Sequence, residues 1–220
     1  SQKILILGDS HAREYFTVLK DTFDMEIVWV SGATTQGLVN PNSKTNSLNI
    51  FEKALREYGL TKDICLLMLG EVDCGYLIWY RKENHQESIE FQIDRSLKNY
   101  FDFLKEKVLK YFSNSKIIIC GVVPPTILDN TDKRFLSGAR SKVKADIFQR
   151  TALTKTYNKK LLKFAQSNNF HFINIFDDVI NKNSNIVDNY FLNENKFNHH
   201  LSAEKVKSIW KIKILSLFKC

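Results

Sequence analysis

The sequence predicts an α/β domain built on a parallel sheet of about five strands with helices on both faces. Apolar runs of strand length alternate along the chain with segments in which apolar residues recur every three or four positions. The runs are apolar almost throughout, which is typical of strands buried on both faces. A chain of 220 residues is long enough for one such domain with a full core, so we predict that residues 1–220 form a single domain.

Five apolar runs are predicted to be strands. They are Lys3–Leu7, Glu26–Val30, Ile64–Leu69, Lys116–Val123 and Phe170–Ile175. Five segments with helical periodicity are His11–Leu19, Leu48–Tyr58, Ile89–Phe112, Lys144–Gln166 and Ser202–Phe218. The strand–helix order along the chain indicates a parallel sheet covered on both faces.

The composition indicates which binding partners and sites are not expected in this protein. The formal net charge is +8, but the lysines are scattered and form no compact basic block with interleaved aromatics, so nucleic-acid binding is not expected. No run of 18 apolar residues occurs, and no membrane span is expected. The four cysteines include no C-x-x-C pair, so no metal site is predicted. The start of the chain has no signal-peptide pattern, which predicts a cytoplasmic location.

The turn after the first predicted strand reads Gly8-Asp9-Ser10-His11 and carries the first candidate for chemistry. Ser10 could be only an N-cap, its oxygen accepting a backbone N–H. Alternatively, Gly8 permits a tight turn, Asp9 fixes the loop, and the helix N-terminus presents Ser10 as a nucleophile beside free N–H groups. The residues alone leave both interpretations open.

A serine nucleophile needs a base and donors for an oxyanion. His200 lies in NHHLSAEKV, just before the last predicted helix, where a loop can fold back over the strand ends. An exposed histidine near a helix start is the alternative. Gly32 and Gly70 follow the second and third predicted strands, at the edge of a parallel sheet where ligands bind, and their backbone can approach a ligand closely.

Four short blocks resemble those of the SGNH/GDSL hydrolase family. They are GDS at 8–10, SGATTQGL at 31–38, GEVD at 70–73 and HLS at 200–202, and their order matches over essentially the whole chain. The resemblance implies a flavodoxin-like three-layer α/β/α sandwich and serine-dependent ester chemistry. Ser10 would match the nucleophile and His200 the base. The backbone N–H groups of Ser10 and Gly32 would match two oxyanion donors, and Asp9, Gly70 and Asp73 would complete the oxyanion and substrate-binding set.

The sequence departs from the family pattern at two positions. Val72 stands where the family commonly has an oxyanion-donating Asn, as in a G-E-x-D subgroup that is associated with polysaccharide modification. Phe197 stands where the family has the triad Asp, three residues before His200. We therefore expect a Ser–His dyad, with Asp188, or else Asn198, as the third catalytic member.

The function that these features predict is acyl-ester chemistry on a carbohydrate through a Ser10 acyl-enzyme. Water as acceptor makes the protein an esterase or O-deacetylase and needs no cofactor. A sugar hydroxyl as acceptor makes it an O-acetyltransferase, with an acyl donor such as acetyl-CoA. The expected partners are a glycan or another acylated small molecule, and a glycan-synthesis enzyme as fusion or complex partner. The alternative is a non-catalytic carbohydrate-binding module on a degenerate scaffold of the same family.

Overall fold

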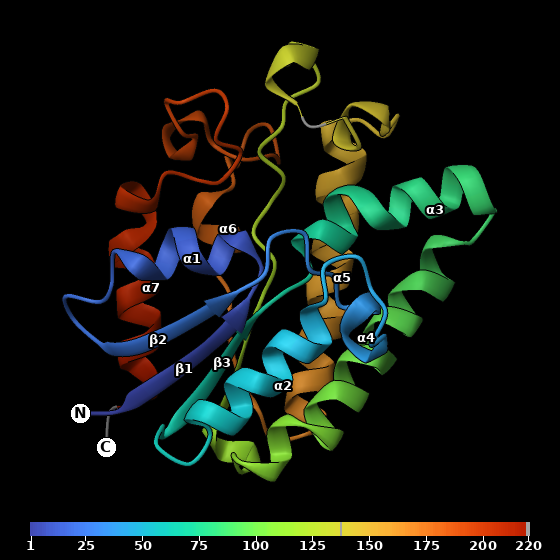
Figure 1. The fold of residues 1–220 in the computed structure, drawn as a ribbon. Coiled ribbons are helices and arrows are strands. Elements are labelled where there is room, and N and C mark those ends of the chain that lie inside the picture. The colour runs from blue at the N-terminus through green and yellow to red at the C-terminus, as the bar shows by residue number, and fades with distance from the viewer. Residues whose placement is uncertain (137, 219–220) are drawn as a thin grey trace.

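Five parallel strands form the centre of the computed structural model, which describes residues 1–136 and 138–218. The strands are β1 (Lys3–Gly8), β2 (Asp24–Trp29), β3 (Ile64–Met68), β4 (Ile117–Cys120) and β5 (His171–Ile173). Their order across the sheet is β2-β1-β3-β4-β5 (Figure 1). This is the flavodoxin-like order, in which the chain moves outward from β1 in both directions and the loops after β1 and β3 separate to leave a crevice.

Helices cover both faces of the sheet. They are α1 (Ser10–Thr17), α2 (Ser47–Tyr58), α3 (Ile78–His85), α4 (Ile89–Glu106), α5 (Ile147–Ser167), α6 (Phe176–Val179) and α7 (Ala203–Leu217). Single 3₁₀ turns are η1 (Gln36–Val39), η3 (Val108–Lys110), η4 (Asn114–Lys116), η5 (Lys133–Phe135), η6 (Arg140–Lys142) and η7 (Asn189–Phe191), and η2 (Asp73–Leu77) is a π turn. Helices α2 to α5 pack on one face, and α1, α6 and α7 pack on the other.

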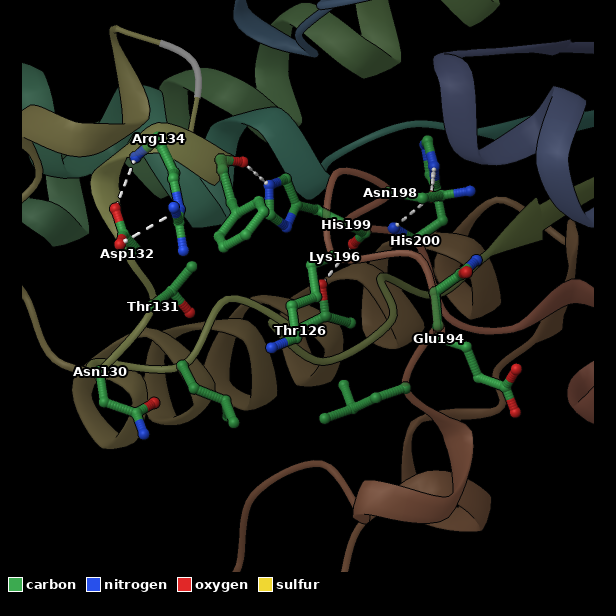
Figure 2. Close-up of a pocket in the computed structure, with 14 residues that line it drawn as sticks. Thr126, Asn130, Thr131, Asp132, Arg134, Glu194, Lys196, Asn198, His199 and His200 are labelled. Carbon is green, nitrogen blue, oxygen red and sulfur yellow. Dashed lines mark hydrogen bonds and ion pairs between the residues drawn. The ribbon is translucent and has the colours of Figure 1, made fainter.

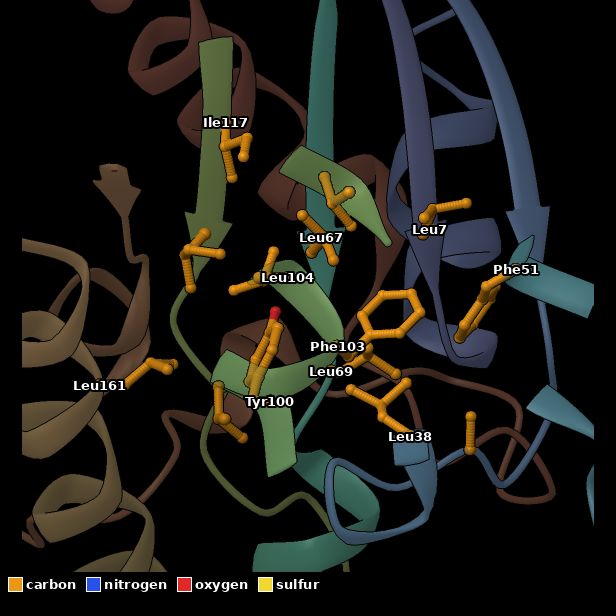
Figure 3. Close-up of a cluster of buried hydrophobic side chains, with 14 of the residues drawn as sticks. Leu7, Leu38, Phe51, Leu67, Leu69, Tyr100, Phe103, Leu104, Ile117 and Leu161 are labelled. Carbon is orange, nitrogen blue, oxygen red and sulfur yellow. The ribbon is translucent and has the colours of Figure 1, made fainter. Parts of the chain in front are cut away.

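The core follows from the period of two along each strand. In β1, Leu5 and Leu7 enter the core under α2 to α5, while Ile4 and Ile6 enter the core under α1 and α7. Figure 3 shows the first of these cores, with Leu7 and Leu67 of the sheet facing side chains of α2 and α4. Because both faces are covered, the strands are apolar without alternation, as the sequence predicted.

The predicted elements are confirmed, with two differences. The predicted helix Ile89–Phe112 ends at Glu106, and its last residues form the turn η3, which still buries Val108. Helices α3 and α6 lie outside the five predicted helical segments. Cys65, Cys74 and Cys120 are buried free thiols, and Cys220 lies outside the described residues.

Packing between α1 and α7 connects distant parts of the chain. The buried Trp210 of α7 stacks on Tyr15 of α1 at 6.2 Å between ring centroids and meets Phe16 edge-on at 5.4 Å. The Tyr15 hydroxyl accepts the backbone N–H of Leu201 at 3.0 Å. This bond fixes the segment before α7 against the first helix, and so brings residue 200 to the carboxyl end of β1.

We predict that Tyr15→Phe destabilises the fold while Tyr100→Phe does not. The first substitution leaves the buried Leu201 N–H without its acceptor, which costs about 1–3 kcal/mol. The Tyr100 hydroxyl is buried with no hydrogen-bond partner among residues 1–136 and 138–218, so its removal leaves no group unpaired. Urea unfolding of both variants checks this, and equal midpoints for the two would contradict it.

Candidate active site

Ser10 begins α1 directly after β1, and three local features set its position. A Cβ at Gly8 would lie 2.6 Å from Ala12 Cβ and from the Met68 carbonyl oxygen, so only glycine allows the first helix to start this close to β3. Asp9 is the N-cap, and its carboxylate accepts the N–H of His11 at 2.9 Å. The Ser10 hydroxyl is therefore not needed as the helix cap, and it lines a cavity at the carboxyl ends of the strands.

His200 lies within hydrogen-bond distance of that hydroxyl. The Ser10 Oγ and His200 Nε2 atoms are 2.9 Å apart, although the two residues are 190 positions apart in the chain. The sequence predicted this pair as nucleophile and base, and the structure brings the two side chains together with the geometry that proton transfer needs.

Asn198, and not Asp188, orients the imidazole. Asn198 Oδ1 lies 2.7 Å from His200 Nδ1 and also accepts the His200 backbone N–H at 3.0 Å. Because an amide oxygen can only accept, His200 carries its proton on Nδ1 and offers Nε2 to Ser10. Asp188 instead caps η7, where its carboxylate accepts Tyr190 N–H and Asn181 Nδ2, and it lies more than 4.0 Å from the ring nitrogens of His200. The third position was therefore assigned wrongly to Asp188, and the alternative, Asn198, occupies it.

Two backbone N–H groups are free beside the hydroxyl. Among the residues that the structure describes, neither the Ser10 nor the Gly32 N–H donates to a protein acceptor. Gly32 has φ +78°, a left-handed conformation that side chains disfavour, and it lines the same cavity as Ser10. Val72 also lines this cavity and has no side-chain donor to add.

Gly70, Asp73 and Asp9 lie behind the cavity wall and do not line it. Asp73 is fully buried, and its carboxylate accepts Thr35 N–H at 2.8 Å and Gln36 N–H at 3.3 Å. It therefore holds the loop after β2, which carries Gly32, and does not contact a substrate. Burial raises the pKa of Asp73 to about 6, although those two N–H groups favour its charged form. Placing these three residues in contact with substrate was an error of assignment.

A second imidazole, which the sequence did not predict as functional, lies next to His200. His11 Nδ1 is 3.0 Å from Asp9 Oδ1, and His11 Nε2 is 3.8 Å from Glu71 Oε2. The His11 ring meets the His200 ring edge-on, with 4.5 Å between centroids. Burial opposes protonation of His11, but the carboxylates of Asp9 and Glu71 outweigh it and raise the pKa of His11 above its usual value.

Glu71 and Arg140 form an ion pair in the wall of the same cavity. The guanidinium binds both carboxylate oxygens of Glu71, at 3.1 and 2.8 Å. Burial would raise the pKa of Glu71, yet Arg140 and His11 outweigh burial and lower this pKa to about 2. Arg140 comes from the loop before α5, for which the sequence gave no functional signal.

Burial and the charged groups around it keep His200 neutral. Burial lowers the pKa of His200, the positive charges of His11, Arg13 and Arg140 lower it further, and Glu71 opposes them only in part, so that the pKa is about 3. A neutral imidazole is the form that can accept the Ser10 proton.

Two neighbouring cavities meet at the histidines. The cavity that contains Ser10, of about 760 Å³ and here named the catalytic cavity, is lined by segments after β1, β2, β3 and β4 and by the segment before α7. A side cavity of about 470 Å³ shares with it Arg134, Phe135, Asn198, His199 and His200, and Figure 2 shows its polar lining, with Asn130, Thr131 and Glu194 around the opening.

The loop after β4 lies against the segment that carries His200. His199 Nε2 hydrogen-bonds the Phe135 carbonyl oxygen, the Thr126 hydroxyl donates to the His199 carbonyl, and the rings of Phe135 and Phe197 meet at 4.8 Å. In Figure 1 these segments, coloured yellow and orange-red, lie together above the sheet. The loop after β4 therefore forms part of both cavities. Ser137, within it, lies outside the described residues.

Over residues 1–136 and 138–218, no group of three His, Cys, Asp or Glu side chains has the arrangement of a metal site. Over the same residues, none of the helices combines the length and the apolar character that crossing a bilayer requires.

A scan of protein-family models and a search of curated protein sequences return no match. Solved structures do match. A GDSL-like lipase from Bacteroides thetaiotaomicron aligns with a TM-score of 0.61 and 12% identity over 98% of this chain and 88% of the lipase. An acetyl xylan esterase aligns with a TM-score of 0.58 and 17% identity over 99% of this chain and 100% of the esterase. An extracellular lipase from Streptomyces rimosus aligns with a TM-score of 0.53 and 13% identity, covering 99% and 100% of the two chains.

Because the sequence identities are only 12–17%, the similarity to these structures establishes the fold alone. The resemblance of the four sequence blocks is confirmed at that level, since the aligned structures include GDSL-type hydrolases and cover nearly the whole chain. The chain has the three-layer α/β/α fold of the SGNH/GDSL hydrolases.

Proposed function

We propose that this protein is a serine esterase that removes an acyl group from a carbohydrate ester through a covalent Ser10 intermediate. The observation that supports this most directly is the 2.9 Å hydrogen bond between Ser10 Oγ and His200 Nε2, in a cavity that Gly32 also lines. A serine that served only as an N-cap would not require an oriented imidazole within hydrogen-bond distance of its hydroxyl.

The reaction would proceed in two steps. Ser10 Oγ attacks the ester carbonyl while its proton passes to His200 Nε2, and the N–H groups of Ser10 and Gly32 donate to the oxyanion. When the tetrahedral intermediate collapses, the ester C–O bond breaks and the leaving alcohol takes the proton from His200. Water then attacks the acyl-enzyme with His200 again as base, which releases the acid and restores the Ser10 hydroxyl.

Arg140 would compensate in part for Val72. The family's Asn donor is missing, but the Arg140 guanidinium lines the catalytic cavity and is held in place by Glu71. Because Glu71 offsets part of its positive charge, Arg140 would add only weakly to the donation from the Ser10 and Gly32 N–H groups.

The lining of the two cavities supports a carbohydrate substrate. Amide, carboxylate and guanidinium groups surround the histidines together with the aromatic rings of Tyr76, Phe135 and Phe197. Such a mixture of hydrogen-bonding groups and flat apolar faces suits a sugar better than a long acyl chain. One of the structures that aligns with this chain is an acetyl xylan esterase.

Ser10→Ala should abolish ester hydrolysis and covalent labelling. Without the hydroxyl no acyl-enzyme forms, so release of acetate from aryl acetates and from acetylated xylo-oligosaccharides falls by at least about 10³-fold. Mass spectrometry of the protein treated with a fluorophosphonate should find the adduct on Ser10 in the unmodified chain and none in the variant.

A chain that binds acetylated oligosaccharides yet gives no adduct and no acetate would contradict the esterase and favour the carbohydrate-binding module. Ser113→Ala is the matched control, because Ser113 is an exposed serine before β4 whose side chain caps no helix and which has no place in the proposed chemistry. This control should leave both readouts unchanged.

Transfer and hydrolysis differ in their dependence on an acceptor. If water is the acceptor, acetate appears at the same rate with or without a sugar acceptor and needs no acetyl-CoA. We expect this result, which quantification of acetate and of acetylated sugar in parallel would check. Product that forms only with acetyl-CoA and a sugar present would instead identify an O-acetyltransferase.

The esterase should keep its activity into mild acid. A histidine with the ordinary pKa of about 6.5 is only about 3% neutral at pH 5, which would lower kcat/KM about 30-fold. Because burial and neighbouring cations lower the pKa of His200 to about 3, the free enzyme still holds a neutral base at pH 5. We expect kcat/KM for an aryl acetate to vary less than about threefold between pH 7.5 and 5. Circular dichroism at each pH controls for unfolding. Because Asp73 has a pKa of about 6 and holds the loop of Gly32, the profile is repeated in Asp73→Asn, and an acid limb centred near 6.5 that persists there would contradict the prediction.

A further inference from the structure

We propose that Glu14 takes the place of the missing triad carboxylate and acts on His200 through the side-chain amide of Asn198. The proposal rests on the proposed function and assigns a positioning residue that the four sequence blocks do not include. It answers the question of how the imidazolium is stabilised when the triad Asp is replaced by Phe197.

The contacts form a continuous relay. Glu14 Oε1 accepts Asn198 Nδ2 at 2.9 Å, and Asn198 Oδ1 lies 2.7 Å from His200 Nδ1. The second oxygen of Glu14 is 3.9 Å from the same Nδ1 atom. Figure 2 shows the amide of Asn198 turned toward the ring of His200.

The first effect of this relay is on the tautomer of the base. An amide in the place of a triad carboxylate can turn its NH₂ group toward the imidazole, and the wrong tautomer then costs about 10⁴ in turnover in a serine protease. Here a carboxylate, which can only accept, holds the Asn198 NH₂ group, so the amide oxygen faces Nδ1. Glu14 thereby favours the tautomer in which Nε2 is free to take the Ser10 proton.

The second effect is on charge. The charged groups that face His200 are His11, Arg13 and Glu14 from α1, Glu71 from the segment after β3, and Arg140 from the loop before α5. Glu71 also favours a charged His200, but its two bonds to Arg140 and its contact with His11 offset much of its negative charge, and no direct Glu71–His200 contact of 4.0 Å or less occurs among the described residues. The cation nearest to Glu14 is Arg13, at 4.0 Å and half-exposed. Glu14 is therefore the negative charge that remains to stabilise a positive charge on His200 during attack.

The position of Glu14 on α1 makes the relay rigid. Glu14 follows Ser10 by four residues, so nucleophile and carboxylate lie on one face of the same helix. Its side chain is only 20% exposed, which limits screening by solvent.

The test separates the charge of Glu14 from its hydrogen bond. Glu14→Gln keeps an oxygen that can accept Asn198 Nδ2 and removes the charge, whereas Glu14→Ala removes both. Each is made in the unmodified chain and in Asn198→Asp, where a carboxylate contacts Nδ1 directly. Glu106→Gln, an exposed residue at the end of α4, is the matched control.

In the unmodified chain we expect Glu14→Gln to lower kcat for an aryl acetate about 10-fold with KM unchanged, and Glu14→Ala to lower it further. In Asn198→Asp we expect Glu14→Gln to leave kcat unchanged or raise it, because the two carboxylates repel one another there. The NMR resonance of the His200 Nδ1 proton should move upfield in Glu14→Gln and stay in place in Glu106→Gln.

A residue that only supported the fold would lower kcat by the same factor in both backgrounds, and that result would overturn the proposal. An Nδ1 resonance that does not respond to Glu14→Gln would overturn it as well, and this measurement requires no turnover. A chain with the resonance shift but without a Ser10 adduct would support the relay while refuting the esterase, so the two hypotheses fail separately.

Discussion

The hydrogen bond between Ser10 and His200 is the contact on which the functional interpretation depends, and the fold is arranged to make it. The hydroxyl is fixed by the turn from β1 to α1, which only glycine at position 8 permits. The imidazole is fixed from the far end of the chain, by Asn198 Oδ1 at its Nδ1 atom and by the Leu201 N–H, which donates to the Tyr15 hydroxyl. Neither partner is on a free loop, which is how a site keeps catalytic geometry within a fraction of an ångström.

The charges around this bond nearly balance in a buried space. His11 lies between Asp9 and Glu71, and Arg140 holds Glu71 from the other side. Each of these four ions has a partner of opposite charge. An unpaired buried charge would cost several kcal/mol of folding free energy. Burial and the net positive charge of the neighbours both lower the pKa of His200, so the imidazole stays neutral at rest; in the proposed reaction it is protonated only while it holds the serine proton.

Much of the fold and the centre of the site could be predicted from the sequence, for definite reasons. Strands buried on both faces are apolar throughout, and parallel strands bring their following loops to one edge, so Ser10, Gly32 and His200 could be placed together. The third catalytic member could not be placed, because the segment 188–200 has no regular period that fixes its register. Only the folded structure shows that Asn198 contacts Nδ1 of His200, whereas Asp188 caps η7.

Three other residues of the site left weaker signals in the sequence. Glu14 follows Ser10 at helical spacing, and this pattern could have marked it as a neighbour of the nucleophile. Arg140 lies in an irregular loop, and its pairing with Glu71 depends on a distant contact that no local pattern encodes. Asp73 matched a block of the family, but a matching block does not show whether a carboxylate faces the substrate or holds a neighbouring loop, and here it holds the loop.

The packing of α7 on α1 couples activity to one local folding event. Trp210 and Leu201 are the buried anchors that keep the segment of the base in place. A molecule in which α7 had detached would retain its sheet and most of its helices and would have a nucleophile without a base. If the proposed esterase activity holds, subglobal opening of this helix would therefore abolish it well below the melting temperature, and turnover would report the docking of a single helix more sensitively than any measurement of overall secondary structure.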